Sequence, residues 1–147
     1  MATQQTQIVM PPHVNGTNRL FGGQLMVWID IVAAVEARRH AQAEVTTVAV
    51  DSLMFLAPVK LNELVVLDAH VTWTGRTSME VRVDSYVEQM DGTRTLVNVA
   101  YLVYVALADG KPKQVKPFNP ETEEEKAEHA AAGARRGLRM IRYKMRT

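Results

Sequence analysis

The chain has 147 residues, a net charge of +1, 47% hydrophobic residues and no cysteine. This length fits one globular domain, and the balanced charge does not indicate a nucleic-acid-binding protein. The lack of cysteine excludes a disulfide framework, a thiolate zinc site and a cysteine nucleophile. No stretch approaches the roughly 18 apolar residues of a membrane span, and residues 1–13 lack the pattern of a signal peptide. We therefore expect a soluble, cytoplasmic protein without membrane insertion.

The apolar pattern of the N-terminal third predicts a short strand, a loop and one long helix. The strand at residues 6–10 ends at Pro11, and the Asn- and Gly-rich segment after it is typical of a loop. The helix runs from Gly23 to about Ala41 and carries three basic residues in its last turns, where the helix dipole favours cations. Because apolar residues occur at every angle around this helix, we expect a sheet to enclose every face of it.

After the helix the hydrophobic period changes to two, as in half-buried strands. Pro58 and the Asp-Gly-Thr turn at residues 91–93 are signals that end or separate strands. We expect four long strands, at residues 45–58, 63–75, 78–90 and 94–107. One helix followed by such strands indicates an α+β fold in which a curved antiparallel sheet wraps around a central helix.

The C-terminal region predicts a second helix and a basic tail. Asn119, followed by Pro and several Glu residues, is a helix start signal, and the helix is expected to end near Gly133 or Gly137. The segment from Arg135 onward contains six cations and no acid. This tail is either a solvated, partly frayed segment or a surface that attracts phosphate. We divide the chain into two parts: a main domain at residues 1–118, and the C-terminal helix and basic tail at residues 119–147.

Asp30 is the one polar residue in the apolar run from Leu25 to Val35. An unpaired carboxylate in an apolar interior costs several kcal/mol, so Asp30 must be paired, protonated or at a cleft. Its neighbours three and four positions away on the helix offer no partner: Met26, Val27, Ala33 and Ala34. A partner must therefore come from another element, or Asp30 lies at a loop or a subunit interface as a structural carboxylate. The Gly22-Gly23 pair at the helix start favours a functional site, because free N–H groups there can hold an oxyanion or phosphate.

Three segments together resemble the hotdog-fold acyl-CoA thioesterases, which include short bacterial enzymes and tandem-domain eukaryotic ones. The segments are NGTNRLFGGQLMVWID at residues 15–30, VTTVAVDSLMFLAPV at residues 45–59 and GRTSMEVRV at residues 75–83. The likeness extends from about Gln7 to Pro117. The chain departs from the family at Asn18 and Asn62-Glu63, where the family often has Gly and Gly-Asp. Because Asn tolerates the left-handed conformation, we expect Asn18 to preserve its loop.

The resemblance implies a hotdog fold, a curved antiparallel sheet around one long central helix, and a set of site residues. Asn15 corresponds to the family's active-site asparagine and Asp30 to its catalytic acid. Gly23 corresponds to the residue whose N–H polarises the thioester carbonyl. The turn and strand start that contact coenzyme A correspond to Gly75, Arg76, Thr77 and Ser78. Phe55 and Pro58 correspond to positions that shape the acyl pocket and the strand end. Beside the resemblance, we expect Met26, Trp28 and Met54 to set the depth of that pocket.

The implied reaction is hydrolysis of fatty acyl-CoA to a free fatty acid and coenzyme A. A carboxylate among apolar residues is a stronger base than one in water, which suits activation of water by Asp30. Direct attack by Asp30, giving a mixed anhydride, is the other route, and Asn15 would position the water or the carbonyl. No cofactor is expected, since coenzyme A is part of the substrate. No metal is expected either, because the four histidines lack ligand spacing.

The resemblance also implies a homodimer, often assembled as a trimer of dimers, in which two sheets join and the two helices lie side by side. Asn15 would then face Asp30 of the neighbouring subunit. Two other functions are compatible with the same fold. A hotdog dehydratase would need a catalytic histidine, for which His13 is the candidate, and a non-catalytic acyl-CoA sensor would not need Asp30.

Overall fold

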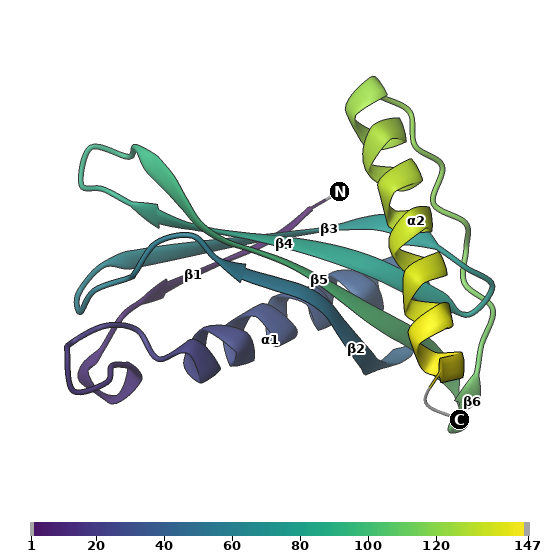
Figure 1. Ribbon diagram of the computed structural model, residues 1–147, viewed down its shortest axis with the longest axis horizontal. Helices are drawn as coiled ribbons and strands as arrows, with labels where there is room; N and C mark the ends of the chain where they lie inside the picture. Colours follow the sequence, from purple (N-terminus) through teal and green to yellow (C-terminus); the bar gives the residue numbers. More distant parts are fainter. Residues whose placement is uncertain (1, 146–147) are drawn as a thin grey trace.

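The computed structural model of the protein describes residues 2–145. It has one antiparallel sheet, with the long helix α1 along one face and the helix α2 crossing the molecule near one end (Figure 1). Two short elements, the 3-10 helix η1 (Pro11–His13) and the strand β6 (Lys111–Pro112), complete the fold. The main elements are β1 (Thr3–Ile8), α1 (Gly22–Ala41), β2 (Glu44–Phe55), β3 (Leu64–Thr74), β4 (Ser78–Glu88), β5 (Arg94–Ala108) and α2 (Glu123–Met145).

The strands lie in the order β1-β3-β4-β5-β2, and β6 pairs with β5. Every pairing is antiparallel, which confirms the predicted α+β class and the predicted order of one strand, one helix and four long strands. β1 lies closer to the N-terminus than predicted, because its pairing with β3 extends from Thr3 to Ile8. β2 is an edge strand, and its register with β5 shifts after Thr47 and again after Val50.

The core lies between α1 and the inner face of the sheet. α1 contributes Leu25, Trp28, Ile29 and Val32, and alternate residues of β3, β4 and β5 face them. The prediction that the sheet encloses every face of α1 is wrong for the single chain, because Val27 and Ile31 are 52% and 47% exposed. One sheet covers only one side of a helix, which leaves the other side open.

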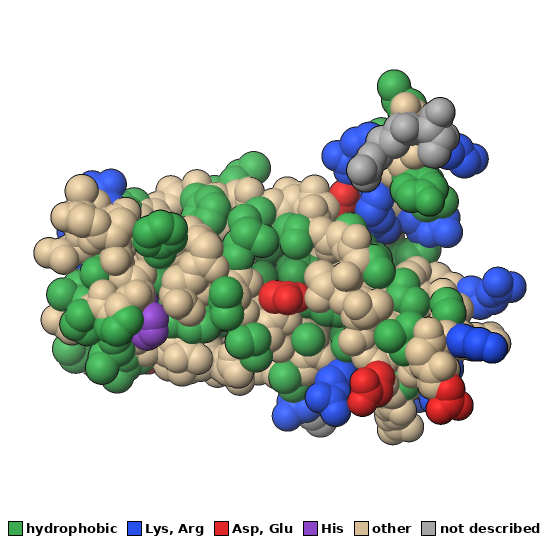
Figure 2. All heavy atoms as spheres, turned by 90° about the horizontal axis from the view of Figure 1, so that it is seen from below, with side chains coloured by type: hydrophobic (Ala, Val, Ile, Leu, Met, Phe, Trp, Pro, Cys, Tyr) green, Lys and Arg blue, Asp and Glu red, His purple; other side chains and the backbone are tan. Residues whose placement is uncertain are grey.

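Exposed apolar side chains of α1, its preceding residue and the edge strand remain uncovered in the single chain. We call this set the open apolar surface: Phe21, Val27, Ile31, Val48, Val50, Met54, Phe55 and Leu56. Figure 2 views the molecule from the side of α1 and shows hydrophobic side chains spread across this side of the body. Most of the cationic side chains visible there lie toward the end that carries α2. Exposed apolar surface of this extent is typical of a protein interface or a ligand groove.

α2 begins and ends elsewhere than the sequence predicts. Its cap is Thr122 rather than Asn119: the Thr122 hydroxyl accepts the N–H of Glu125 at 3.0 Å, and the Glu125 carboxylate accepts the N–H of Thr122 at 3.0 Å. This reciprocal pair is a capping box. The helix continues through both glycines to Met145, so the predicted frayed tail is wrong up to that residue. Residues 146 and 147 lie outside the described part of the chain.

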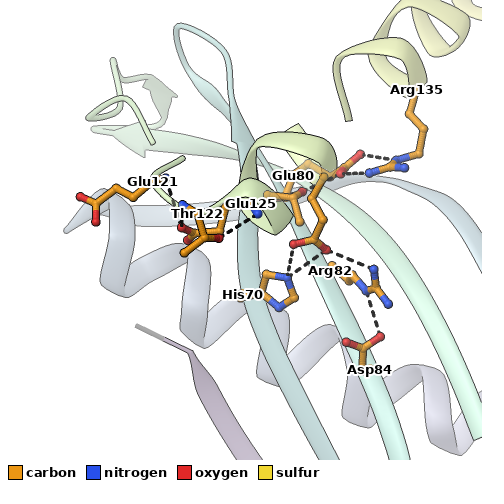
Figure 3. A network of polar contacts seen from close by, with 10 residues as sticks. His70, Glu80, Arg82, Asp84, Glu121, Thr122, Glu125 and Arg135 are labelled. Atoms are coloured by element: carbon orange, nitrogen blue, oxygen red, sulfur yellow. Dashed lines mark hydrogen bonds and ion pairs between the residues drawn. The ribbon is translucent and has the colours of Figure 1, made fainter. Parts of the chain in front are cut away.

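Ion pairs with the outer face of the sheet hold α2 in place (Figure 3). Arg135 donates two hydrogen bonds to Glu80 of β4, at 3.0 and 2.7 Å, and Glu80 is completely buried. Arg139 and Arg142 bind Asp51 of β2 at 2.9 and 2.7 Å. Buried acids on the sheet thus bind the cations that the sequence placed in a tail.

Candidate active site

Asp30 is half-buried and has two partners, both from the sheet. The Thr47 hydroxyl of β2 donates to Asp30 Oδ1 at 2.9 Å, and the Tyr104 hydroxyl of β5 donates to the same oxygen at 2.5 Å. Thr47 and Tyr104 are register partners in the β2–β5 ladder, so the two donors occupy one rung of the sheet. This confirms the expectation that partners for Asp30 come from other elements.

Tyr104 is a permanent donor toward Asp30. Burial, the hydrogen bond to Asp30 and the nearby Asp30 charge together raise the pKa of Tyr104 well above its usual value. The phenol therefore stays protonated at physiological pH. The hydrogen bonds described for residues 2–145 give Asp30 Oδ1 two donors and Oδ2 none. One carboxylate oxygen is held by the protein, and the other has no hydrogen-bond donor among the described residues.

Asn15 lies on the exposed loop before α1, and its side-chain oxygen organises that loop. Asn15 Oδ1 accepts the N–H of Thr17 at 3.0 Å, the Thr17 hydroxyl at 2.8 Å and the N–H of Arg19 at 3.2 Å. Asn18 adopts a left-handed conformation, with φ 57°, as predicted. Asp30 lies eight residues after the start of α1, about 12 Å along its axis. No hydrogen bond links Asn15 to Asp30 within the described chain, so the two are not joined in one subunit.

Gly23 lies in the first turn of α1, close to this loop. The first hydrogen bond of the helix runs from the N–H of Leu25 to the carbonyl of Phe21, so the N–H groups before Leu25 lie outside the helical ladder. Phe55 of β2 packs close to the helix start, because a Cβ at Gly22 would lie 3.5 Å from its ring. The free N–H groups beside Phe55 form a site suited to an oxyanion.

The turn between β3 and β4 holds the residues predicted to contact coenzyme A. Gly75 donates its N–H to the Ser78 carbonyl at 2.8 Å, and a Cβ at Gly75 would lie 2.8 Å from Ser78 Oγ and 2.9 Å from the Trp73 ring. Only glycine fits there without displacing a neighbour. Arg76 is exposed, and its carbonyl accepts the N–H of Val115 at 2.9 Å. The Lys-rich segment of residues 111–116 therefore runs beside this turn, and together they form a cationic end of the sheet.

The residues predicted for the acyl pocket divide into two groups. Trp28 is 5% exposed and packs edge-on against His13, with the ring centroids 4.9 Å apart. Met54 and Phe55 are 58% and 53% exposed and belong to the open apolar surface. Phe55 and Pro58 also line a cavity of about 340 Å³ beside Leu25 and the loop before α1. Met26, on α1, is partly buried.

His13, the histidine named for the dehydratase alternative, makes a local main-chain hydrogen bond. Its Nδ1 accepts the N–H of Met10 at 3.0 Å, which closes the η1 turn. Within residues 2–145, no group of three or more His, Cys, Asp or Glu side chains is placed to hold a metal ion. The same residues contain no helix long and apolar enough to cross a membrane.

The sequence profile of the thioesterase superfamily matches residues 17–93, just over half of the chain. The protein belongs to the thioesterase superfamily. This thioesterase is 42% identical to the uncharacterized acyl-CoA thioester hydrolase YkhA of Bacillus subtilis, over 94% of its own chain and 81% of the relative. The family resemblance predicted from the sequence is confirmed.

Two solved structures are similar to the thioesterase over nearly its whole length. An apo-hexameric acyl-CoA thioesterase is 40% identical with a TM-score of 0.92, and the match covers 97% of this chain and 92% of that one. An acyl-CoA hydrolase from Staphylococcus aureus, solved with butyryl coenzyme A, coenzyme A and coenzyme A disulfide, is 36% identical. Its TM-score is 0.91, and the match covers 98% of this chain and 91% of that one. It has also been solved as variants in which an aspartate, an asparagine or a threonine is replaced by alanine.

Thr47 and Tyr104 are the residues at this site of the thioesterase that sequence analysis missed. Thr47 lies in a β-branched strand segment, and Tyr104 lies in an apolar one, so each sequence context indicates a strand and nothing more. The missing information was the register of β2 against β5 and the position of α1 above it. For Tyr104, the hydroxyl in an apolar strand segment was the available signal, because a buried hydroxyl needs a partner.

Proposed function

We propose that this thioesterase hydrolyses fatty acyl-CoA to a free fatty acid and coenzyme A, with Asp30 as the catalytic carboxylate. The observation that carries the proposal is the carboxylate itself. It lies in an apolar run of α1, one oxygen is held by Thr47 and Tyr104, and Val27 and Ile31 of the open apolar surface are its neighbours on the helix. An apolar surface next to a carboxylate suits a substrate with an acyl chain and a reactive carbonyl. Met54 and Phe55 are the side chains of that surface proposed to contact the acyl chain.

Two routes lead to the same products. In the first, Asp30 takes a proton from water, and the hydroxide attacks the thioester carbon. The C–S bond then breaks, and the thiolate of coenzyme A receives the proton. In the second, Asp30 attacks the carbon itself, releases the thiolate and forms a mixed anhydride, which water hydrolyses. In both routes the N–H of Gly23 would stabilise the negative charge on the carbonyl oxygen.

We propose that each active site is built from two subunits. The loop of Asn15 lies near the start of α1 and Asp30 lies about 12 Å along it, so a second, antiparallel α1 beside the first would bring one chain's Asn15 toward the other's Asp30. The open apolar surface and the unpaired edge of β2 offer the area for such a dimer. The hexameric relative supports assembly of three such dimers.

The Staphylococcus aureus variants support the choice of residues. Their asparagine precedes their aspartate by 15 residues, and their threonine follows the aspartate by 17. Asn15, Asp30 and Thr47 have the same two spacings in this chain. The three residue types therefore have the same spacing in both chains, and Thr47 and Asp30 are joined by a hydrogen bond here.

The function is tested by incubating the purified protein with acyl-CoAs of increasing chain length and a thiol reagent. We expect release of free coenzyme A. Binding without release would indicate a sensor, and loss of water from a β-hydroxyacyl-CoA without release of thiol would indicate a dehydratase. Either result would contradict the proposal.

The composite site predicts complementation between two inactive variants. Asn15→Ala and Asp30→Asn should each be nearly inactive alone. After the two are unfolded together and refolded, a mixed dimer has one site with both residues intact and one with neither. With random pairing about half of the dimers are mixed, so we expect about a quarter of the parent activity per chain. Mass spectrometry of the native mixture must confirm the mixed dimer. Its presence without recovered activity would show that Asn15 and Asp30 do not form one site across the interface.

Arg76 is predicted to bind the phosphates of coenzyme A. Arg76→Ala should raise KM for acyl-CoA several-fold, change kcat less and weaken the salt dependence of KM, because an exposed cation acts through screened attraction. Arg94→Ala is a matched control. Arg94 is also exposed, but it begins β5 beside the far end of β4 and pairs with Glu88. Equal KM values for the two variants across ionic strengths would place phosphate binding elsewhere.

A further inference from the structure

Tyr104 makes two contacts with a single residue. Its hydroxyl lies 2.5 Å from Asp30 Oδ1 and 3.0 Å from the main-chain carbonyl oxygen of Asp30. A single phenol hydrogen between these two acceptors links the side chain of Asp30 to its own backbone. This arrangement fixes the rotation of the carboxylate relative to α1, which a donor on the side chain alone would not do.

The position of Tyr104 makes this contact rigid. Tyr104 is completely buried in the core between β5 and α1, so its ring has no room to rotate away. Thr47, the other donor, is exposed on the edge strand and lies next to the register shift in β2. Of the two hydroxyls, the buried one therefore sets the geometry of Asp30, and the exposed one can respond to substrate or to the neighbouring subunit.

We propose that Tyr104 is a positioning residue of the active site, which holds Oδ1 of Asp30 in place and directs Oδ2 toward the thioester. This inference rests on the proposed function of Asp30. It divides the two carboxylate oxygens by role: Oδ1 is anchored by Tyr104 and Thr47, and Oδ2 takes the proton of water or attacks the carbonyl carbon. No ion pair reaches Asp30 among residues 2–145, so these two hydroxyls are its described polar partners.

Tyr104→Phe tests the proposal because it removes one oxygen and retains the buried ring. We expect kcat to fall about tenfold, in line with a lost hydrogen bond to a charged group, and KM to change little. An ionised carboxylate that loses a donor is protonated more easily, so the acid limb of the kcat profile should move to higher pH. A merely structural tyrosine would not move that limb.

Tyr101→Phe is the matched control. Tyr101 lies on the same strand but faces outward, where its ring stacks on the guanidinium of Arg135 at 3.7 Å, and phenylalanine preserves that contact. We expect its kcat and pH profile to equal those of the parent. A Tyr104→Phe enzyme with the kcat and acid limb of the Tyr101→Phe enzyme would overturn the proposal. A loss of kcat in Tyr104→Phe that is the same at every pH would also overturn it.

Two further measurements separate this proposal from the proposed function and from a folding defect. If the parent protein releases no coenzyme A, the proposed function fails. A carbon-13 NMR titration of the Asp30 carboxyl in the parent and in Tyr104→Phe still shows whether the Tyr104 hydrogen bond affects that carboxyl. If Tyr104→Phe does not fold, a comparison of Thr47→Val with Thr47→Ser tests the other hydrogen bond to Asp30 Oδ1, whose donor is exposed. Thr47→Ser keeps the donor and should preserve the acid limb, whereas Thr47→Val should shift it. Identical titrations of the parent and Tyr104→Phe would refute the anchoring of Oδ1 by Tyr104. Identical acid limbs for the Thr47 pair would show that hydrogen bonds to Oδ1 do not set the acid limb, which the proposal requires.

Discussion

Asp30→Asn is expected to lower kcat for acyl-CoA by about a hundredfold or more while the protein stays folded. The amide has the shape of the carboxylate but neither accepts a proton from water nor attacks a carbonyl at neutral pH. Its oxygen can still accept the hydrogen bonds of Thr47 and Tyr104, so the local structure should persist. Release of coenzyme A, followed with a thiol reagent, measures the effect.

Circular dichroism and the oligomeric state of Asp30→Asn serve as its controls. Both should match those of the parent, because Asp30 is only half-buried and its amide replacement is isosteric. A folded Asp30→Asn enzyme that works at nearly the parental rate would show that Asp30 is a structural carboxylate. The chemistry would then have to be assigned to another group.

Arg135→Ala is expected to destabilise the protein by about 3 kcal/mol, because it leaves a buried carboxylate without its counterion. Glu80 has no exposed surface, and its remaining described partner is the Thr72 hydroxyl at 2.6 Å. For a chain of this size, the melting temperature should fall by about 10 °C. Chemical denaturation of both proteins at the same concentration measures the loss, because assembly then contributes equally to both.

Two variants show whether the buried charge causes this loss. Arg142→Ala removes an exposed cation that shares Asp51 with Arg139, and should cost less than about 1 kcal/mol. Adding Glu80→Gln to Arg135→Ala removes the unpaired charge and should restore part of the stability. If Arg135→Ala costs no more than Arg142→Ala, the Glu80 pair contributes little to the attachment of α2.

The sequence was most informative where a residue broke its local pattern. Asp30 was singled out because it is the one acid in an apolar run, and the order of strands and helix followed from the change of hydrophobic period. The partners of Asp30 were beyond prediction, because they depend on the register between strands far apart in sequence. Thr47 and Tyr104 are 57 positions apart in the chain and opposite each other in the sheet.

The C-terminal helix shows the opposite case, in which local signals were misleading. Gly133 and Gly137 predicted a helix end, since glycine weakens a helix by about 1 kcal/mol relative to alanine. Tertiary ion pairs outweighed that cost. Arg135 and Arg139 lie beside these glycines and bind buried acids of the sheet, which keeps the last turns helical. A run of cations has no visible partner in a linear sequence when the acids lie some 55 to 88 positions away.

If the open apolar surface is buried in the proposed dimer, stability and activity of this protein both depend on its concentration. In the proposed dimer that surface is buried between chains, so part of the free energy of folding is gained only on association. Dilution then separates the subunits, parts Asn15 from the neighbour's Asp30 and exposes a strand edge prone to aggregation, all at once. In that proposed dimer Val27 and Ile31 would be essential for turnover as subunit contacts, although they have no chemistry of their own.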